Sequence, residues 1–206
     1  MSVELFFIYD SHCPWSYAAT PLINAVDQSL PDVAIHLWHC GYFSDADGDS
    51  VITKQQLVQV KEQSNVNFPP AYVSKLSENK DSTLCANLMT WASNKTPKQA
   101  LTLLNALQLA HFNAGNELSS EADLIEIVTG LKLSPPAKVF NNSKLTNDAE
   151  AQIHEIYALQ EIIATQAIPA LLLAINDELI LLNHNLYLSN PEAIVEAINI
   201  ELAKHA

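Results

Sequence analysis

Near its N-terminus the chain reads LFFIYDSHCPWS at residues 5–16, an apolar run followed by a polar turn and a Cys-Pro-Trp-Ser motif. Residues 4–9 are rich in aromatic and branched side chains, which is typical of a buried strand. Because proline is tolerated in the first turn of a helix, the pattern after it predicts a helix from Cys13 to about Ser29. The Cys13 sulfur is therefore expected where a strand meets a helix N-terminus.

A cysteine at such a junction is a candidate nucleophile. The first turn of a helix has free backbone N–H groups and a partial positive charge, and both stabilise a thiolate. We therefore expect a solvent-accessible sulfur with a pKa below the ordinary ~8.5. Ser16 follows three residues later, so the motif holds a single sulfur. The Ser16 hydroxyl is expected either to hydrogen-bond toward that sulfur or to lie on the helix surface.

The rest of the chain predicts a mixed architecture. Residues 33–38 are expected to form a second strand, parallel to the first and joined to it by a right-handed crossover. Residues 170–174 and 179–182 predict a hairpin around Asn176-Asp177. Helices are expected over residues 84–92, 97–114, 120–131 and 148–165, and from Asn190 onward. We expect one domain from residues 1–52 and 148–206, with residues 53–147 as a helical insertion.

Composition narrows the class of protein. The 206 residues are 49% hydrophobic and carry a net charge of −13, which disfavours binding to nucleic acid. No run of about 18 apolar residues predicts a membrane helix, and no export signal is expected. The three cysteines are far apart and do not form a disulfide framework, so a reducing cytoplasmic location is expected.

The order of elements resembles the thioredoxin fold in its DsbA-like form, an α/β fold with a large helical insertion. The resemblance is carried by Asp10, residues 13–15, Tyr17, residues 107–115 and residues 168–170. It is strongest to the branch of predicted cytoplasmic thiol-disulfide isomerases. In that family the motif is Cys-x-x-Cys, its first sulfur attacks the substrate, and the proline matching Pro169 is cis and faces that sulfur.

Related kappa-class glutathione transferases and hydroxychromene-carboxylate isomerases share this fold and have Ser-Pro-Tyr-Ser-like motifs at the same junction. In them a serine at the position matching Cys13 activates glutathione. The motif of this chain lies between the two patterns, because it keeps the first cysteine and has Ser16 in place of the second.

The resemblance and the motif together define the candidate site. Cys13 and Ser16 are the candidate catalytic residues. The candidate substrate-binding residues are His12, Pro14, Trp15, Ile168 and Pro169. His12 is expected either to tune the charge at the sulfur or to be solvated. Trp15 is expected either to form an exposed recognition ring or to pack inward.

No metal site is expected. His36, His39 and Cys40 lie close in sequence, but the two histidines point to opposite faces if the strand continues through them. The acidic run at residues 45–49 fails the register of a calcium loop. Cys85 is expected to be a buried helix residue.

We therefore expect a monothiol protein that exchanges thiols and disulfides in the manner of a disulfide isomerase. A second interpretation is a kappa-like glutathione-dependent isomerase or transferase, and a third is a non-catalytic peptide-binding module. No tightly bound cofactor is expected. Glutathione is the candidate co-substrate, thiols and disulfides are the expected partners, and a homodimer is a candidate assembly.

Overall fold

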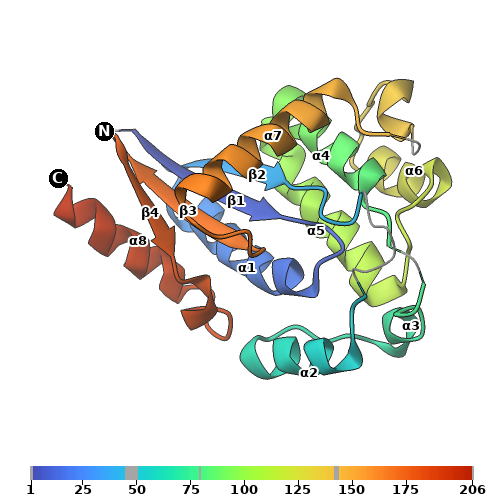
Figure 1. Ribbon diagram of the computed structural model, residues 1–206, viewed down its shortest axis with the longest axis horizontal. Helices are drawn as coiled ribbons and strands as arrows, with labels where there is room; N and C mark the ends of the chain where they lie inside the picture. The colour runs from blue at the N-terminus through green and yellow to red at the C-terminus, as the bar shows by residue number, and fades with distance from the viewer. Residues whose placement is uncertain (1, 45–50, 79, 142–143, 206) are drawn as a thin grey trace.

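The computed structural model describes residues 2–44, 51–78, 80–141 and 144–205. Its centre is a four-stranded sheet in the order β2-β1-β3-β4 (Figure 1). Strand β1 (Val3–Tyr9) runs parallel to β2 (Ala34–His39) and antiparallel to β3 (Ala170–Ile175). Strand β4 (Glu178–Leu182) pairs with β3 as the predicted hairpin. The two strands that flank the N-terminal motif and the late hairpin thus form one sheet.

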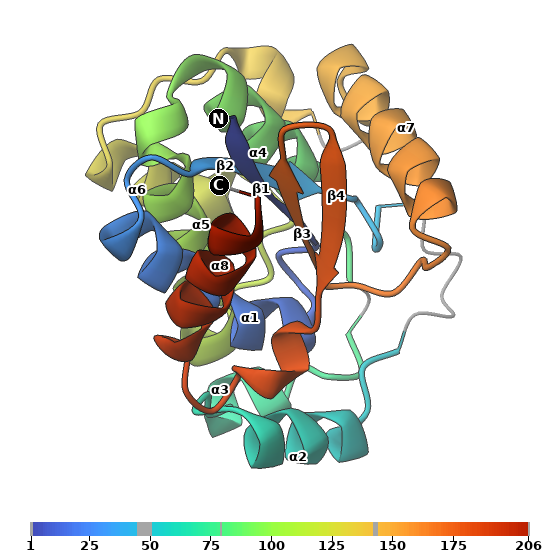
Figure 2. The same ribbon diagram turned by 90° about the vertical axis from the view of Figure 1, so that its left-hand side faces the viewer.

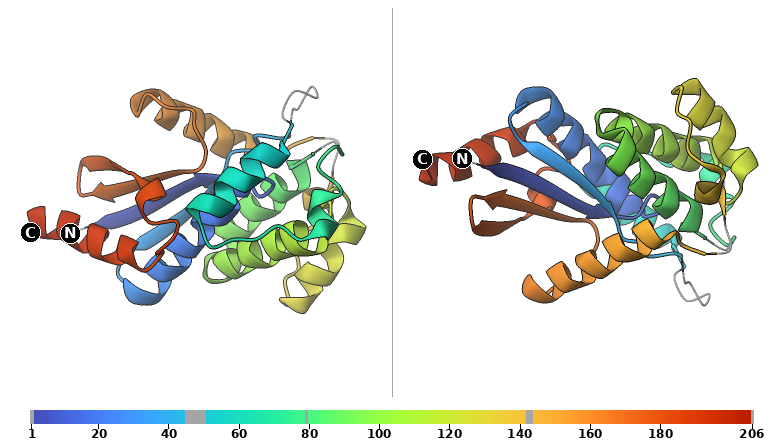
Figure 3. Two further views of the ribbon diagram at one scale, coloured as in Figure 1. Left: turned by 90° about the horizontal axis from the view of Figure 1, so that it is seen from below. Right: turned by 90° about the horizontal axis from the view of Figure 1, so that it is seen from above.

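Helices cover both faces of this sheet. Helices α1 (Pro14–Ser29) and α8 (Ala193–Lys204) lie on one face, and α7 (Asn147–Ile162) lies on the other (Figures 2 and 3). The alternation of β1 explains the two layers: Leu5 and Phe7 belong to the core beneath α1, while Ile8 packs with Ile156 of α7. Because both faces are covered, β1 is apolar along nearly its whole length.

The middle of the chain is helical, as predicted. It contains α2 (Lys54–Gln63), α3 (Pro70–Val73), α4 (Thr83–Lys95), α5 (Pro97–Ala114), α6 (Glu121–Gly130) and the short 3-10 helix η1 (Ala137–Phe140). A second 3-10 helix, η2 (His184–Leu186), follows β4. Residues of α4, α5 and α6 share the largest buried cluster with the sheet. The core of residues 53–147 is therefore continuous with that of the sheet. The division of the chain into two domains remains a prediction.

Local sequence signals explain most helix ends. Thr53 and Ser120 form capping boxes with Gln56 and Asp123, which satisfy free N–H groups at the starts of α2 and α6. Helix α7 ends three residues earlier than expected, because Ala164 adopts a left-handed conformation with φ +53°. The last helix begins at Ala193 rather than Asn190, since residues 190–192 form a turn. Within the described residues, no helix is long and apolar enough to cross a membrane.

Gly115 fixes the position of α3 against α5. It has φ +70° and caps α5, and a Cβ at this residue would lie 2.5 Å from the carbonyl oxygen of Ala71 in α3. Left-handed backbone costs other residues about 1–2 kcal/mol, and the short contact adds to that cost. No side chain at this position fits without moving α3.

We expect Gly115→Ala to lower the free energy of unfolding by about 2 kcal/mol or more, measured by urea denaturation. Gly130→Ala is the matched control, because a Cβ there meets no atom within 4 Å. The control is expected to be neutral or stabilising by up to about 1 kcal/mol. Equal effects of the two substitutions would contradict this account of Gly115.

Candidate active site around Cys13

Cys13 lies where the sequence predicts, at the residue that precedes α1. It is the N-cap of the helix, with Pro14 in the first turn. Its backbone N–H donates to the carbonyl oxygen of Asp10 (3.1 Å), and its own carbonyl accepts from the N–H of Tyr17 (3.0 Å). Its side chain makes no capping hydrogen bond. The sulfur is thus not used to cap the helix.

The expectation of an open sulfur with a lowered pKa is wrong. Cys13 is only 8% exposed, and burial raises the pKa of its thiol above the ordinary value. The backbone N–H and hydroxyl of Ser16 act in the opposite direction, and the Asp10 carboxylate adds to the rise. Loss of solvent around the sulfur therefore outweighs the helix terminus, because a thiolate loses more hydration than the donors replace.

Ser16 is fully buried, so a position on the helix surface is wrong for it. Its hydroxyl oxygen accepts a hydrogen bond from the backbone N–H of Asp10 at 3.3 Å. The same hydroxyl, acting on the Cys13 sulfur, lowers the pKa of that thiol. Ser16 therefore links the turn before the helix to the Cys13 sulfur.

A cavity of about 400 Å³, here called the Cys13 cavity, opens beside the sulfur. It is lined by Cys13, Pro14, Trp15, Tyr42, Phe43, Val51, Ile52, Gln56, Gln166, Ala167 and Ile168. The start of α1 forms one part of its lining, and the loop before β3 forms another. The peptide bond between Ile168 and Pro169 is cis, as the resemblance implies. Pro169 itself lines a smaller neighbouring cavity that shares Ala167.

Trp15 both packs inward and borders the cavity, and so combines the two positions expected for it. It is half-buried, packs against two apolar clusters, and still contributes to the lining of the Cys13 cavity. Pro14 and Ile168 also line this cavity, whereas His12 and Ser16 are not among its lining residues. The structure thus places three of the five candidate substrate-binding residues at the cavity.

Asp10 is the main residue that the sequence analysis did not place in the site. Its carboxylate is fully buried and accepts hydrogen bonds from the backbone N–H groups of His12 (2.8 Å) and Phe43 (3.3 Å) and from the Ser82 hydroxyl (2.7 Å). Burial alone would raise the pKa of this carboxyl, but His39, His12 and Ser82 lower it well below its usual range. The sequence signal that could have identified Asp10 is its position as an acidic residue between an apolar strand and Cys13.

His12 is also fully buried, so solvation of its ring is wrong. The ring is hydrogen-bonded through Nε2 to the carbonyl oxygen of Glu117 (3.0 Å) and through Nδ1 to the Ser11 hydroxyl (3.1 Å). That hydroxyl lies 3.0 Å from Nε2 of His39, whose Nδ1 accepts from the N–H of Gly41. A chain of buried polar groups thus connects β2 to the turn before Cys13.

Burial keeps two histidines of this region, His39 and His111, neutral. Burial lowers the pKa of His39 to about 4, although Asp10 acts in the opposite direction. Burial likewise lowers the pKa of His111, whose ring lies 4.4 Å from that of His12. Neither His39 nor His111 is therefore charged near neutral pH.

The cluster of His36, His39 and Cys40 does not converge on one point. His36 is partly exposed and pairs with Glu4 at 2.8 Å, while His39 is buried beside Asp10. Over the part of the chain that the structure describes, no group of three or more His, Cys, Asp or Glu residues is arranged for a metal ion. The acidic run at 45–49 lies outside the described residues.

The other cysteines are poor candidates for resolving a Cys13 disulfide. All three cysteines are free, and Cys40 and Cys85 are buried. Burial raises the pKa of Cys85 to about 12 and that of Cys40 well above its ordinary value. Cys85 lies in α4, as the sequence predicts for a buried helix residue.

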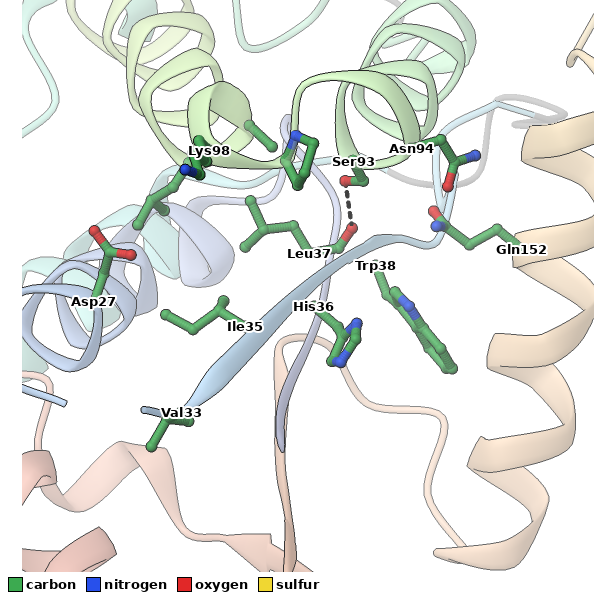
Figure 4. A pocket seen from close by; sticks show the side chains of 13 residues that line it. Asp27, Val33, Ile35, His36, Leu37, Trp38, Ser93, Asn94, Lys98 and Gln152 are labelled. Carbon is green, nitrogen blue, oxygen red and sulfur yellow. Dashed lines mark hydrogen bonds between the residues drawn. The ribbon is translucent and has the colours of Figure 1, made fainter. Parts of the chain in front are cut away.

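A second cavity of about 390 Å³ lies at the free edge of β2 (Figure 4). There the Ser93 hydroxyl donates to the carbonyl oxygen of Leu37 at 3.4 Å, and Asp27 and Lys98 lie at one end. It shares no lining residue with the Cys13 cavity and contains no cysteine. Of these two cavities, only the Cys13 cavity is lined by a cysteine, and it is the candidate active site.

Comparison with known proteins shows the fold. No family model matches the chain, and no curated protein is similar to it in sequence. The cytosolic disulfide reductase DsbM from Pseudomonas aeruginosa superposes with a TM-score of 0.83 at 19% identity, covering 97% of this chain and 98% of that one. A structure of DsbM with GSH gives a TM-score of 0.81 at 19% identity, covering 97% and 99% of the two chains.

Two further structures are similar over nearly their whole length. A candidate protein disulfide isomerase from Nitrosomonas europaea has a TM-score of 0.74 at 15% identity, with 100% of both chains covered. A 2-hydroxychromene-2-carboxylate isomerase has a TM-score of 0.61 at 16% identity, covering 98% of this chain and 99% of that one. The chain therefore has the DsbA-like thioredoxin fold that its sequence resembles.

Because burial raises the pKa of the Cys13 thiol, we expect slow alkylation at neutral pH. The rate of modification of Cys13 by iodoacetamide, followed by peptide mass analysis, should keep rising above pH 9. An unstructured peptide carrying the same motif serves as the control and should react half-maximally near pH ~8.5. A Cys13 midpoint below that of the peptide would contradict the burial argument.

The neutral His39 predicts a loss of stability in acid. The unfolded ring binds its proton near pH 6.5 and the folded ring only near pH 4, so the free energy of unfolding should fall as the pH drops between these values. His111 and His184 act in the same direction. Urea denaturation across this range should show that His39→Gln reduces the slope by about one proton. An unchanged slope would contradict a neutral buried His39.

Proposed function

We propose that this protein catalyses thiol-disulfide exchange with a single sulfur, that of Cys13, in the manner of a disulfide isomerase. One observation carries the proposal: Cys13 precedes α1 and lines a cavity of about 400 Å³ that the loop before the cis Pro169 also lines. A nucleophile next to a binding surface for an extended substrate is what the reaction requires. The fold shared with DsbM supports this class of reaction.

The exchange proceeds in two balanced steps. Cys13 loses its proton to solvent, and its thiolate attacks one sulfur of a substrate disulfide, R–S–S–R′. The bond from Cys13 to the R sulfur forms as the S–S bond of the substrate breaks, and R′–S⁻ leaves and takes up a proton. A second thiol, R″–SH, then loses its proton and attacks the R sulfur of the mixed disulfide. It forms R–S–S–R″ and returns the Cys13 thiolate.

The second thiol comes from outside the protein. Ser16 cannot form a disulfide, and Cys40 and Cys85 are buried thiols with raised pKa values. The net result is therefore isomerisation of a disulfide or transfer of a thiol adduct rather than net oxidation. Glutathione is the second thiol that we propose, with support from the GSH complex of DsbM.

The Cys13 cavity suits a small thiol peptide. Its volume falls within the roughly 300–1,000 Å³ of small-molecule sites. The amides of Gln56 and Gln166 and the hydroxyl of Tyr42 belong to residues that line it, together with the apolar Trp15 and Ile168. The described lining residues include no charged side chain, so we propose recognition of backbone amides and apolar groups of the substrate.

Each candidate residue has a role in this reaction. Cys13 is the nucleophile, and Ser16 stabilises its sulfur by hydrogen bonding. Pro14, Trp15 and Ile168 contact substrate in the cavity, and Pro169 holds the loop that carries Ile168. His12 positions the turn before Cys13. A cytosolic location fits the small number of cysteines and the location given for DsbM.

A kappa-like glutathione-dependent isomerase is the second candidate. The fold shared with 2-hydroxychromene-2-carboxylate isomerase supports it. In this version glutathione remains bound while a small molecule reacts, and Cys13 forms no lasting disulfide. The two candidates differ in whether a mixed disulfide with Cys13 accumulates.

We expect Cys13→Ser to reduce the transfer of glutathione from a glutathionylated peptide by about 100-fold or more, because the nucleophile is lost. Cys40→Ala is the matched control and should retain the activity, since Cys40 lies in a different buried cluster. Mass spectrometry of the wild type should reveal one glutathione on Cys13. Binding of glutathione without that adduct would support the isomerase candidate instead.

Exchange by the Cys13→Ser variant at the wild-type rate would refute the single-sulfur mechanism. A wild type that neither exchanges thiols nor binds glutathione would refute both catalytic versions. Binding of unfolded peptides that survives Cys13→Ala, with no exchange by the wild type, would identify a non-catalytic peptide-binding module.

A further inference from the structure

Tyr72 is a buried tyrosine that shares an apolar cluster with the reactive cysteine. This cluster, here called the Cys13 cluster, consists of Cys13, Phe43, Ile52, Leu57, Tyr72, Leu76 and Phe112. The Tyr72 ring packs edge-on against Phe112, with centroids 4.9 Å apart, and against His111 at 5.2 Å. Tyr72 is 1% exposed, so its phenol lies inside the protein and not at its surface.

The Tyr72 hydroxyl has no hydrogen-bond partner among the described residues. A buried hydroxyl without an acceptor destabilises the folded state, and phenylalanine would fill nearly the same space without that cost. The hydroxyl is explained if an acceptor forms in another state of the site. The group in this cluster that changes its hydrogen-bonding character during thiol exchange is the sulfur of Cys13.

Electrostatics connects the two groups. Burial is the main cause of the raised pKa of Tyr72, and a charge on Cys13 raises it further. The phenol therefore keeps its proton over the pH range in which the thiol ionises. A thiol is a weak acceptor, whereas a thiolate accepts strong, charge-assisted hydrogen bonds.

We propose that Tyr72 is a positioning residue of the Cys13 site, whose hydroxyl donates a hydrogen bond to the sulfur once the thiol has lost its proton. The hydroxyl then replaces part of the hydration that a buried thiolate lacks, beside the donors supplied by Ser16. The inference rests on the proposed function, because it gives the anion of Cys13 a role in exchange.

The other charged and titratable groups around the pair do not supply this donor. The Asp10 carboxylate raises the pKa of Cys13. His111 donates through Nδ1 to the carbonyl oxygen of Asn116, and burial keeps its ring neutral. Lys80 lies 6.0 Å from the Tyr72 ring centroid and donates to the carbonyl oxygen of Lys75. His12 bonds to the Glu117 carbonyl oxygen and to Ser11.

The backbone holds Tyr72 in this position. Helix α3 is only four residues long, but its Ala71 carbonyl lies against Gly115, where a Cβ would not fit. The N–H of Tyr72 donates to the carbonyl oxygen of Pro69 at 3.0 Å. The phenol is thus placed by a close backbone contact with α5 as well as by ring packing.

The test compares Tyr72→Phe with Tyr9→Phe. Tyr9 also has a buried hydroxyl without a partner among the described residues, but it belongs to the core beneath α1 and not to the Cys13 cluster. The pH dependence of Cys13 alkylation is measured for both variants by peptide mass analysis, and folding is checked by urea denaturation.

We expect Tyr72→Phe to move the alkylation midpoint of Cys13 upward by about one pH unit, which is about a tenfold slower reaction below the midpoint. Its urea midpoint should not fall, because an unpaired hydroxyl is removed from the resting state. Tyr9→Phe should leave the alkylation profile unchanged. Unchanged midpoints in both variants, or equal changes in both, would overturn the inference.

The alkylation assay uses no disulfide substrate. Its result therefore tests the Tyr72 contact separately from the proposed exchange reaction. A midpoint that moves only in Tyr72→Phe, in a protein whose wild type performs no exchange, would support the Tyr72 contact and refute the proposed reaction. If the wild type performs exchange but the Cys13 alkylation midpoint is unchanged in Tyr72→Phe, the proposed reaction is supported and the Tyr72 contact is refuted.

Discussion

The site depends on the buried carboxylate of Asp10. It accepts hydrogen bonds from the turn that leads to α1, from the loop after β2 through Phe43, and from the start of α4 through Ser82. Three segments that are distant in sequence are thereby joined at one charge, directly before Cys13. Removing such a charge from water is favourable only when its oxygens are satisfied by donors, so the three segments must meet in this arrangement.

Burial of this region also disfavours ionisation of the Cys13 thiol. A helix N-terminus stabilises an anion, but the apolar cluster around Cys13 and the nearby Asp10 carboxylate oppose it, and the opposing effects prevail in the resting protein. Donors whose hydrogen bonds to the sulfur strengthen as charge develops offer a solution. Ser16 and the proposed contact from Tyr72 are of this kind. The thiol would then be activated during the reaction and stay largely protonated between turnovers.

A single sulfur at the cavity distinguishes this site from one with a pair of cysteines. Because Ser16 cannot close a disulfide and the other cysteines lie in separate buried positions, a mixed disulfide at Cys13 would persist until an external thiol enters the same cavity. The amides of Gln56 and Gln166 give that cavity polar groups without charge. Such a lining is compatible with a peptide-like thiol and with a small glutathione-dependent substrate, which is why the two catalytic candidates share one site.

The sequence alone determined the four strands, the helix that begins after Cys13, the helices α4 to α8, and the single-sulfur motif, because periodicity, proline positions and residue identity are local properties. It did not identify α2 and α3 within the predicted helical insertion. It did not determine the pKa of Cys13 or the burial of His12, since both depend on segments that approach from elsewhere in the chain. Asp10 was visible, but its partners were not. Only the tertiary structure decided how much water remains at the sulfur, because solvent exclusion is the sum of contacts from α1, α3, α5 and the loops around them, and no single segment encodes it.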